Sequence, residues 1–291
     1  MLKLFATSIR YRELLAAFVG RELRARYRGS FLGGFWLLLQ PVIFLAVYYV
    51  VFVEMMNANL FTASDVPDGP LTDVQQLYAR ESGKVTALSM FVAMIPWQGL
   101  QECVGRSATT ISDNGNLIKK ISFPSELLPV YIMLYNLFNV VVGLAVFTIA
   151  AYLSLGIWPS LQYLWLLPVI LVLQGMFMLG LGLLLSATTV FLRDLVQLVP
   201  MAMTVWFFIT PIIFWKTPKP EYQWIMDWNP ARYLMDLYRT VFIFPPGVLR
   251  GSVAGEIPWR TLGIFGGTSV FVLFLGLKVF RRKKYDFADE L

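Results

Sequence analysis

The fold is decided by residues 21–53, which read RELRARYRGSFLGGFWLLLQPVIFLAVYYVVFV. The first eight of these residues include four arginines, and the 25 residues from Gly29 to Val53 carry no charge. About 20 apolar residues in a helix cross the roughly 30 Å hydrocarbon core of a bilayer, so this run predicts a membrane span. Arginines beside a first span resist translocation. We therefore expect the chain to begin on the cytoplasmic side.

The composition indicates an integral membrane protein. Of the 291 residues, 57% are hydrophobic and 14% are charged, against about 25% charged residues in soluble domains. The net charge is +6, but the basic residues gather at the ends of apolar runs, where they meet anionic head groups. We expect membrane lipids as partners, and no nucleic acid. One cysteine and no histidine exclude an internal disulfide and remove the commonest metal ligand, so no metal site is expected.

The charge pattern predicts an all-α fold in one transmembrane domain, residues 1–291. Residues 127–192 form an uncharged run of 66, which is too long for one span, and Gly156–Ser160 supplies a break. The basic cluster Arg281–Lys284 stops the last span and leaves the C-terminus in the cytoplasm. The six predicted spans are residues 30–53, 87–106, 127–153, 161–187, 195–215 and 260–280.

The segments between the spans have their own signatures. Residues 9–28 predict an amphipathic interface helix with Arg21, Arg24 and Arg28 on its polar face; a disordered basic tail is the alternative. Residues 54–86 form an exterior loop, and residues 107–123 form an inner loop. In the exterior segment 216–258, Asn229 caps a helix with Pro230 at its first position. At about 13 residues this helix is too short to span, so it is interfacial or re-entrant.

Several kinds of chemistry are missing from the sequence. There is no G-x-x-x-x-G-K-[ST] phosphate loop, so the chain cannot bind and hydrolyse ATP alone. No ionisable residue lies in the middle of a predicted span, where a proton- or sodium-coupled carrier usually places one. If the chain moves a substrate, a partner supplies the energy. This points to a permease.

Four short motifs resemble one family. They are Tyr27–Gly33 followed by Trp36 and Gln40-Pro41, Asn116–Lys120 followed by Phe123-Pro124, Phe191–Leu195, and Asn229-Pro230. In this order and spacing they are similar to the permease subunit of type-2 ABC exporters of cell-surface polysaccharide, which include O-antigen, capsule and teichoic-acid exporters. The 54–86 loop departs from the pattern because it is longer than the first exterior loop usual in that family.

The resemblance implies a homodimer in the bacterial cytoplasmic (inner) membrane with two ATPase subunits, which bind ATP-Mg, on its cytoplasmic side. It implies a lipid-linked glycan as substrate, O-antigen of lipopolysaccharide first, then capsule or teichoic acid. The 107–123 loop would couple to the ATPase, with the interface helix beside it, and the 216–258 helices would form an exterior gate. The implied coupling residues are Asn116, Leu117, Ile118, Lys119, Lys120 and Ile121. The candidate channel residues are Trp36, Phe44, Tyr48, Tyr49, Trp206 and Phe207, and the candidate gate residues are Tyr233, Tyr238 and Arg239.

Alternatives stay open at this stage. Lys119 and Lys120 could be topology charges only, the aromatic residues could face lipid, and Arg239 could be an interfacial anchor. The chain could export a small amphiphile or drug instead of a polymer. It could also be a membrane-embedded enzyme or scaffold of glycan assembly, but its only dense acidic group is Glu54, Asp65, Asp68 and Asp73 in a loose loop.

Overall fold

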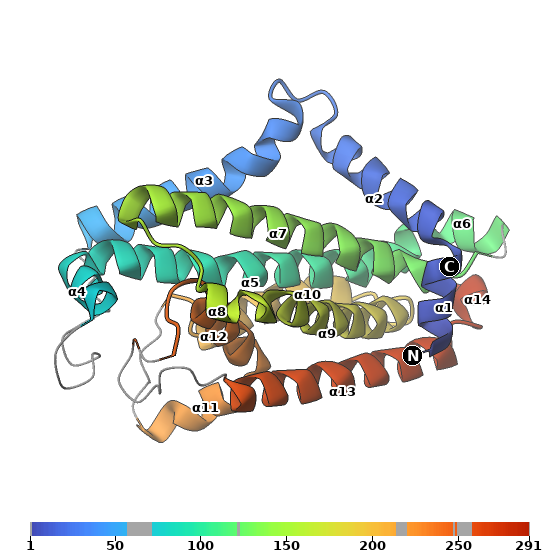
Figure 1. The fold of residues 1–291 in the computed structure, drawn as a ribbon. Coiled ribbons are helices and arrows are strands. Elements are labelled where there is room, and N and C mark those ends of the chain that lie inside the picture. The colour runs from blue at the N-terminus through green and yellow to red at the C-terminus, as the bar shows by residue number, and fades with distance from the viewer. Residues whose placement is uncertain are drawn as a thin grey trace.

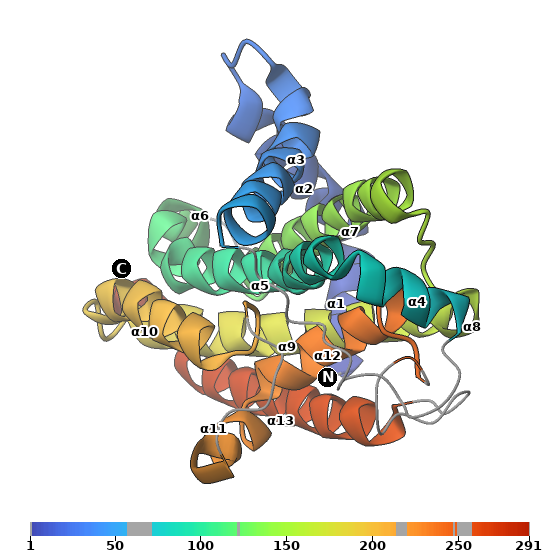
Figure 2. The same ribbon diagram turned by 90° about the vertical axis from the view of Figure 1, so that its left-hand side faces the viewer.

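The structure, a computed structural model, describes residues 2–56, 72–120, 123–213, 220–246, 248 and 258–290. Every regular element among these residues is a helix. Five long helices lie side by side as a bundle (Figures 1 and 2). They are α5 (Ser82–Asp113), α7 (Leu127–Leu155), α9 (Leu166–Thr189), α10 (Leu195–Ile209) and α13 (Trp259–Lys283).

The N-terminal helices stand partly outside this bundle. In Figure 1, α2 and α3 form an inverted V over α7, with their connection at its apex. Gly29 has φ +80° in this connection, a conformation that residues with a side chain rarely adopt. The N-terminal elements are α1 (Leu2–Arg10), α2 (Arg12–Tyr27), the 3₁₀ turn η1 (Gly33–Phe35), α3 (Trp36–Tyr48) and the π-helical η2 (Tyr49–Met55).

Short helices close the two ends of the bundle (Figure 1). One end, which we call the α6 end, carries α1, α6 (Gly115–Lys120) and α14 (Phe287–Glu290). The opposite end, the α4 end, carries α4 (Asp73–Arg80), α8 (Leu161–Leu164) and α11 (Gln223–Asp227). The 3₁₀ turn η4 (Pro220–Tyr222) precedes α11, and α12 (Pro230–Phe242) packs between α5, α9 and α13.

Local sequence explains several helix ends. Gly156 ends α7 with φ +68°, and its N–H bonds to the Ala151 and Tyr152 carbonyls, so the predicted break in the uncharged run is confirmed. Asn229 caps α12 as predicted, since its side chain accepts a hydrogen bond from the Ala231 N–H and Pro230 occupies the first turn. Helix α12 buries one side in the bundle, where Leu234, Leu237, Tyr238 and Val241 are fully buried.

The main difference between the prediction and the structure concerns the number of membrane spans. Four helices of the described part are long and apolar enough to cross a membrane: Gly33–Met55, Leu127–Leu155, Leu166–Thr189 and Trp259–Lys283. Helix α10 is apolar but shorter, because it ends before Thr210-Pro211. Helix α5 is long but contains Lys84, Glu102 and Arg106.

Other predicted boundaries shift. The helix expected at residues 9–28 is divided at Tyr11 into α1 and α2. Residues 107–113 of the expected inner loop are the last turns of α5, because no helix-breaking residue precedes Asn114-Gly115. The span expected at 161–187 divides at Trp165 into α8 and α9. Residues 57–71, 121–122, 214–219, 247 and 249–257 lie outside the described residues.

Candidate functional site

A network of ion pairs joins α2 to α5 toward the α6 end. Arg26 Nη1 lies 2.5 Å from Glu102 Oε1, and Arg106 Nη2 lies 2.5 Å from Glu22 Oε1. Arg106 Nη1 also lies 3.7 Å from Glu102 Oε1. Arg26 Nη1 donates a hydrogen bond of 2.6 Å to the Tyr135 hydroxyl of α7. Two acids and two bases therefore hold three helices together, and the four charges sum to zero.

The position of Arg26 in this network affects its pKa. Burial acts to lower the pKa of Arg26, but the charge of Glu102 and the Tyr135 hydroxyl outweigh that effect, and the pKa is raised above its usual value. The guanidinium groups of Arg26 and Arg106 also lie 5.9 and 5.1 Å from the centre of the Tyr135 ring. The raised pKa keeps Arg26 charged in this network.

Apolar contacts hold the rest of α2 against the bundle. Leu15 and Phe18 are buried, and the Phe18 ring stacks on Tyr131 with 5.4 Å between centroids. The guanidinium of Arg21 lies 4.8 Å from the centre of the Phe18 ring. Of the other predicted interface arginines, Arg24 and Arg28 are exposed. Glu22 and Arg26, one turn apart on α2, carry opposite charges on the side that faces α5. This pattern in the sequence could have predicted the ion pairs between the two helices.

The predicted coupling residues lie on and after α6. Asn116 and Lys119 are exposed, whereas Leu117 and Ile118 are half-buried and pack against the protein's own core. The Lys120 side chain and Ile121 lie outside the described residues. Helix α6 follows α5 after one residue, Asn114, whose side-chain amide donates to the Thr110 carbonyl. The ion-pair network and α6 are thus connected by one continuous stretch of α5.

The candidate channel residues of span 1 differ in exposure. None of the residues of α3 is buried, and Trp36 is 38% exposed, with its indole N–H donating to the Ser30 hydroxyl. Phe44, Tyr48 and Tyr49 are half-buried. The Tyr48 ring stacks on Phe52 and approaches Phe91 of α5. Helix α3 therefore contacts the bundle on one side and leaves a long apolar side uncovered.

The two candidate channel residues of α10 pack against the protein's own interior. The Trp206 ring makes edge contacts with Trp97 and Phe177, and its indole N–H donates to Asn229 Oδ1 at 2.8 Å. Phe207 lies against Trp97 and Phe208. Phe208 is 64% exposed, so it is more open than Trp206 and Phe207, which are half-buried.

The candidate gate residues occupy different positions on α12. Tyr233 is half-buried, and its hydroxyl donates to the Asp227 carbonyl at 2.8 Å. Tyr238 is fully buried and donates to Gln174 Oε1 of α9. Arg239 is 4% exposed, and its guanidinium donates to the carbonyls of Ser89, Pro211 and Ile212. Tyr238 and Arg239 thus fix α12 to α9, α5 and the end of α10.

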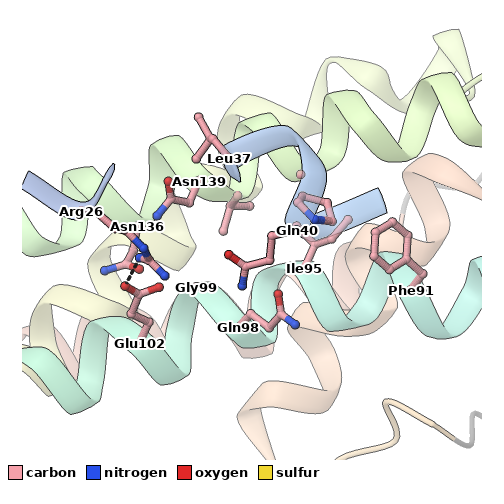
Figure 3. A pocket seen from close by; sticks show the side chains of 13 residues that line it. Arg26, Leu37, Gln40, Phe91, Ile95, Gln98, Gly99, Glu102, Asn136 and Asn139 are labelled. Atoms are coloured by element: carbon pink, nitrogen blue, oxygen red, sulfur yellow. Dashed lines mark hydrogen bonds and ion pairs between the residues drawn. The ribbon is translucent and has the colours of Figure 1, made fainter. Parts of the chain in front are cut away.

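A hollow with polar walls lies between α3, α5 and α7 (Figure 3). Its polar end holds Arg26 and Glu102 with Asn136 and Asn139, and its apolar end holds Phe91 and Ile95. The lining residues are Arg26, Leu37, Gln40, Pro41, Phe91, Ile95, Gln98, Gly99, Glu102, Asn136, Asn139, Val140 and Gly143. No group of three or more Cys, Asp or Glu in the described part of the chain could hold a metal ion.

Sequence reasoning missed most of this arrangement. The network joins residues that are far apart in the sequence, since Arg26 of α2 is 76 residues from Glu102 of α5 and 109 residues from Tyr135 of α7. Asn136 and Gln174 are the buried amides inside otherwise apolar helices. A polar residue within an apolar span is a signal of function or of interhelical bonding, and it was available in the sequence.

Comparison with known proteins gives a consistent result. Residues 13–243 match the family described as ABC-2 type transporter. The whole chain aligns with the whole of the O-antigen export system permease protein RfbA of Myxococcus xanthus, with 31% identity over 294 residues. Two proteins of the same name from Klebsiella pneumoniae are 24% and 25% identical, and each alignment covers 96% of this chain and 95% of the relative.

Proposed function

Because the chain belongs to the ABC-2 type transporter family, we propose that it is the membrane permease subunit that exports O-antigen, a lipid-linked polysaccharide, at the expense of ATP. The observation that carries this proposal is the end-to-end similarity to permeases named for O-antigen export. A permease subunit is not itself an enzyme, and the absence of a phosphate loop from the sequence agrees with ATP hydrolysis on a partner.

The proposed topology has six spans in the bacterial inner membrane, with both termini in the cytoplasm. Helices Gly33–Met55, α7, α9 and α13 supply four spans by length and composition, and α5 and α10 supply the other two. The charges of α5 support its inclusion, because Glu102 and Arg106 are paired with α2 and do not face lipid alone. The basic cluster at the end of α13 favours a cytoplasmic C-terminus.

The proposed assembly is a homodimer with two ATPase subunits docked at the α6 end. The ATPase subunits bind ATP-Mg. Support for the docking site comes from α6, where Asn116 and Lys119 are exposed on a short helix directly after α5. Support for the dimer comes from α3, since a span with no buried residue leaves a large surface for a second copy or for substrate. Helix α2 would transmit movement because ion pairs join it to α5.

The proposed channel runs along the exposed side of α3, with Trp36 at one end and Phe44, Tyr48 and Tyr49 deeper in the wall. Flat aromatic faces suit a polymer of sugars because they contact the C–H faces of sugar rings without selecting one residue type. Trp206 and Phe207 would support the wall from behind, since both contact Trp97. The α11–α12 segment, with Tyr233, Tyr238 and Arg239, would form the exterior gate.

Complementation tests the proposed function. In cells from which the gene has been deleted, the wild-type chain together with its ATPase should restore O-polysaccharide on the cell surface, detected by antibody on intact cells. Affinity purification of the chain should recover the ATPase in equimolar amount. Export without any ATPase, or normal surface polysaccharide in the deletion strain, would contradict the proposal.

A further inference from the structure

A hollow with charged and apolar walls lies at the α6 end, where α1, the start of α7 and the end of α13 meet. Its walls include Leu4, Thr7, Glu126, Leu127, Arg281 and Lys284. Its volume is about 300 Å³, at the lower end of the range of about 300–1,000 Å³ for small-molecule sites. In Figure 1, α1 crosses this end of the bundle and reaches the end of α13. The hollow is therefore large enough for a small polar group such as a lipid head group.

One cation of this hollow has no partner in the described part of the chain. The Arg281 side chain is half-buried, and its guanidinium makes no hydrogen bond, ion pair or ring contact with any described residue. A guanidinium that has lost part of its hydration favours an anion as its partner. Arg281 therefore indicates that an anion from outside the chain fits here.

The second cation is already held in place but keeps donors to spare. The Lys284 ammonium lies 3.0 Å from Glu126 Oε1, and an ammonium has three N–H donors. Glu126 repels an anion, but its charge is balanced by that of Lys284. Two cations and one carboxylate among the lining residues leave a net charge of +1 in the hollow.

The position of the hollow along the bundle indicates a lipid as the source of the anion. Arg281 begins the basic cluster that ends α13, and Leu127 begins α7. Both helices are candidate membrane spans, so their ends lie where the hydrocarbon core meets the head groups. In the proposed topology this is the cytoplasmic side, whose leaflet carries anionic lipids. The membrane itself supplies an anion at this depth.

The chemistry of the walls suits a phosphodiester. The fork of N–H donors of an arginine matches two phosphate oxygens, and a lysine adds a point charge. A net charge of +1 balances the single negative charge of a phosphodiester, whereas a diphosphate carries more negative charge. Leu4 and Leu127 form an apolar part of the wall, which can contact the glycerol and the first methylene groups of a phospholipid.

We propose that this hollow is a binding site for an anionic phospholipid of the cytoplasmic leaflet, with the Arg281 guanidinium and the Lys284 ammonium donating hydrogen bonds to its phosphate group. Glu126 positions Lys284. The inference rests on the proposed topology, which puts the hollow at the cytoplasmic head groups. The bound lipid joins α1 to the ends of α7 and α13, and it is separate from the exported glycan.

Photolabelling of the wild-type complex locates the lipid. The purified permease–ATPase complex is placed in nanodiscs of phosphatidylcholine that contain a probe with a diazirine near its head group, either phosphatidylglycerol or phosphatidylcholine. Labelled peptides are identified by mass spectrometry after illumination. We expect the phosphatidylglycerol probe to label α1 and the end of α13 about tenfold more than the phosphatidylcholine probe does, which corresponds to 1.4 kcal/mol. Equal labelling by the two probes would overturn the inference.

Two neighbouring arginines give a matched pair of variants. Arg281→Gln is the test, and Arg282→Gln is the control, because Arg282 belongs to the same basic cluster but is exposed. We expect labelling by the phosphatidylglycerol probe to fall about tenfold in Arg281→Gln, as for the loss of a charge-assisted contact. In Arg282→Gln it should change by less than about twofold, because exposed charges contribute little.

An equal loss in the two variants would show only a general attraction of the surface for anionic lipid, and it would overturn the site. Arg281→Lys, which keeps the charge but not the fork, should retain part of the labelling. Gel filtration and co-purification of the ATPase show whether Arg281→Gln assembles. If it does not assemble, the labelling of the wild-type complex decides.

Competition identifies the source of the phosphate, because the lipid carrier of the glycan offers the same chemistry. Unlabelled phosphatidylglycerol should displace the probe, and polyprenyl diphosphate at the same concentration should displace less of it. Stronger displacement by polyprenyl diphosphate would overturn the assignment to a phospholipid. Displacement by neither lipid would show that the labelling is not at a binding site.

The two proposals fail separately, because the labelling does not require transport. If the wild-type chain does not restore export, the proposed function is wrong. If export is restored but phosphatidylglycerol labels these helices no better than phosphatidylcholine, the phospholipid site is wrong and the proposed function stands.

Discussion

Gly276 of α13 lies directly against the backbone of Gly180 of α9. A Cβ atom built on Gly276 would approach the Gly180 carbonyl oxygen to 2.2 Å, and a Cβ atom on Gly180 would approach the backbone of Val272 and Leu273 to 2.6 Å. Membrane helices associate through such small residues, because apolar side chains gain little by leaving lipid. The two glycines therefore set the distance between α9 and α13.

Gly276→Ala is expected to separate these helices. The clash is with backbone, which cannot rotate away, so we expect a loss of about 1–3 kcal/mol of stability, the usual effect of overpacking. The measurement is the thermal unfolding midpoint of the purified protein in detergent. Gly267→Ala in the same helix is the control, since its Cβ would meet nothing within 4 Å. An equal midpoint for the two variants would contradict the assignment.

Local rules predicted the parts of the fold that one short stretch determines. The Gly156 break and the Asn229 cap each depend on neighbouring residues, so the sequence was sufficient. The all-helical class followed from long apolar runs in the same way. The division of residues 9–28 at Tyr11 was not predicted, because no glycine or proline marks it.

The candidate site was less predictable because its contacts join distant residues. Arg239 looked like a gate or an interfacial residue, and nothing in its own segment points to the Ser89 carbonyl 150 residues away. Trp206 was selected as a channel aromatic, whereas its indole bonds to Asn229. Side-chain type gave the candidates, but tertiary packing decides which of them face inward.

Arg239→Met is expected to destabilise the α12 region. The substitution keeps the length of the side chain but leaves the Pro211 and Ile212 carbonyls, both bonded at 2.8 Å, without this donor. A buried carbonyl left without its donor typically costs about 1–3 kcal/mol. Limited proteolysis of the purified protein should show faster cleavage near α12 than in wild type. Arg232→Met, a more exposed residue of the same helix, is the control, and equal cleavage of the two variants would argue against a structural role for Arg239.

Reversing the Glu22–Arg106 pair tests the link between α2 and α5. Glu22→Arg alone places a third cation beside Arg106 and Arg26, and we expect export to fall by about tenfold, which corresponds to 1.4 kcal/mol. The double variant Glu22→Arg, Arg106→Glu restores opposite charges at the 2.5 Å contact, although it disturbs the weaker contact with Glu102. Recovery of at least part of the export in the double variant, measured as surface polysaccharide, is the expected result. A double variant no better than its worse single parent would show that the pair does not couple the two helices.

The proposed docking of the ATPase at α6 is tested most directly at Lys119, which is exposed and can be changed without disturbing the core. If Lys119 meets acidic residues on the rim of the ATPase groove, Lys119→Glu converts attraction into repulsion. We expect recovery of the ATPase in affinity purification to fall by roughly tenfold at low salt and by less at high salt, because surface charge pairs are screened.

Leu117→Asp and Ile118→Asp should abolish docking more completely, but both side chains are half-buried against the bundle. The folding of these two variants must therefore be checked by gel filtration of the permease alone. Asn116→Asp, at the neighbouring exposed position, controls for added negative charge on α6. Normal recovery of the ATPase with Lys119→Glu and with a folded Leu117→Asp variant would place the docking site elsewhere on the protein.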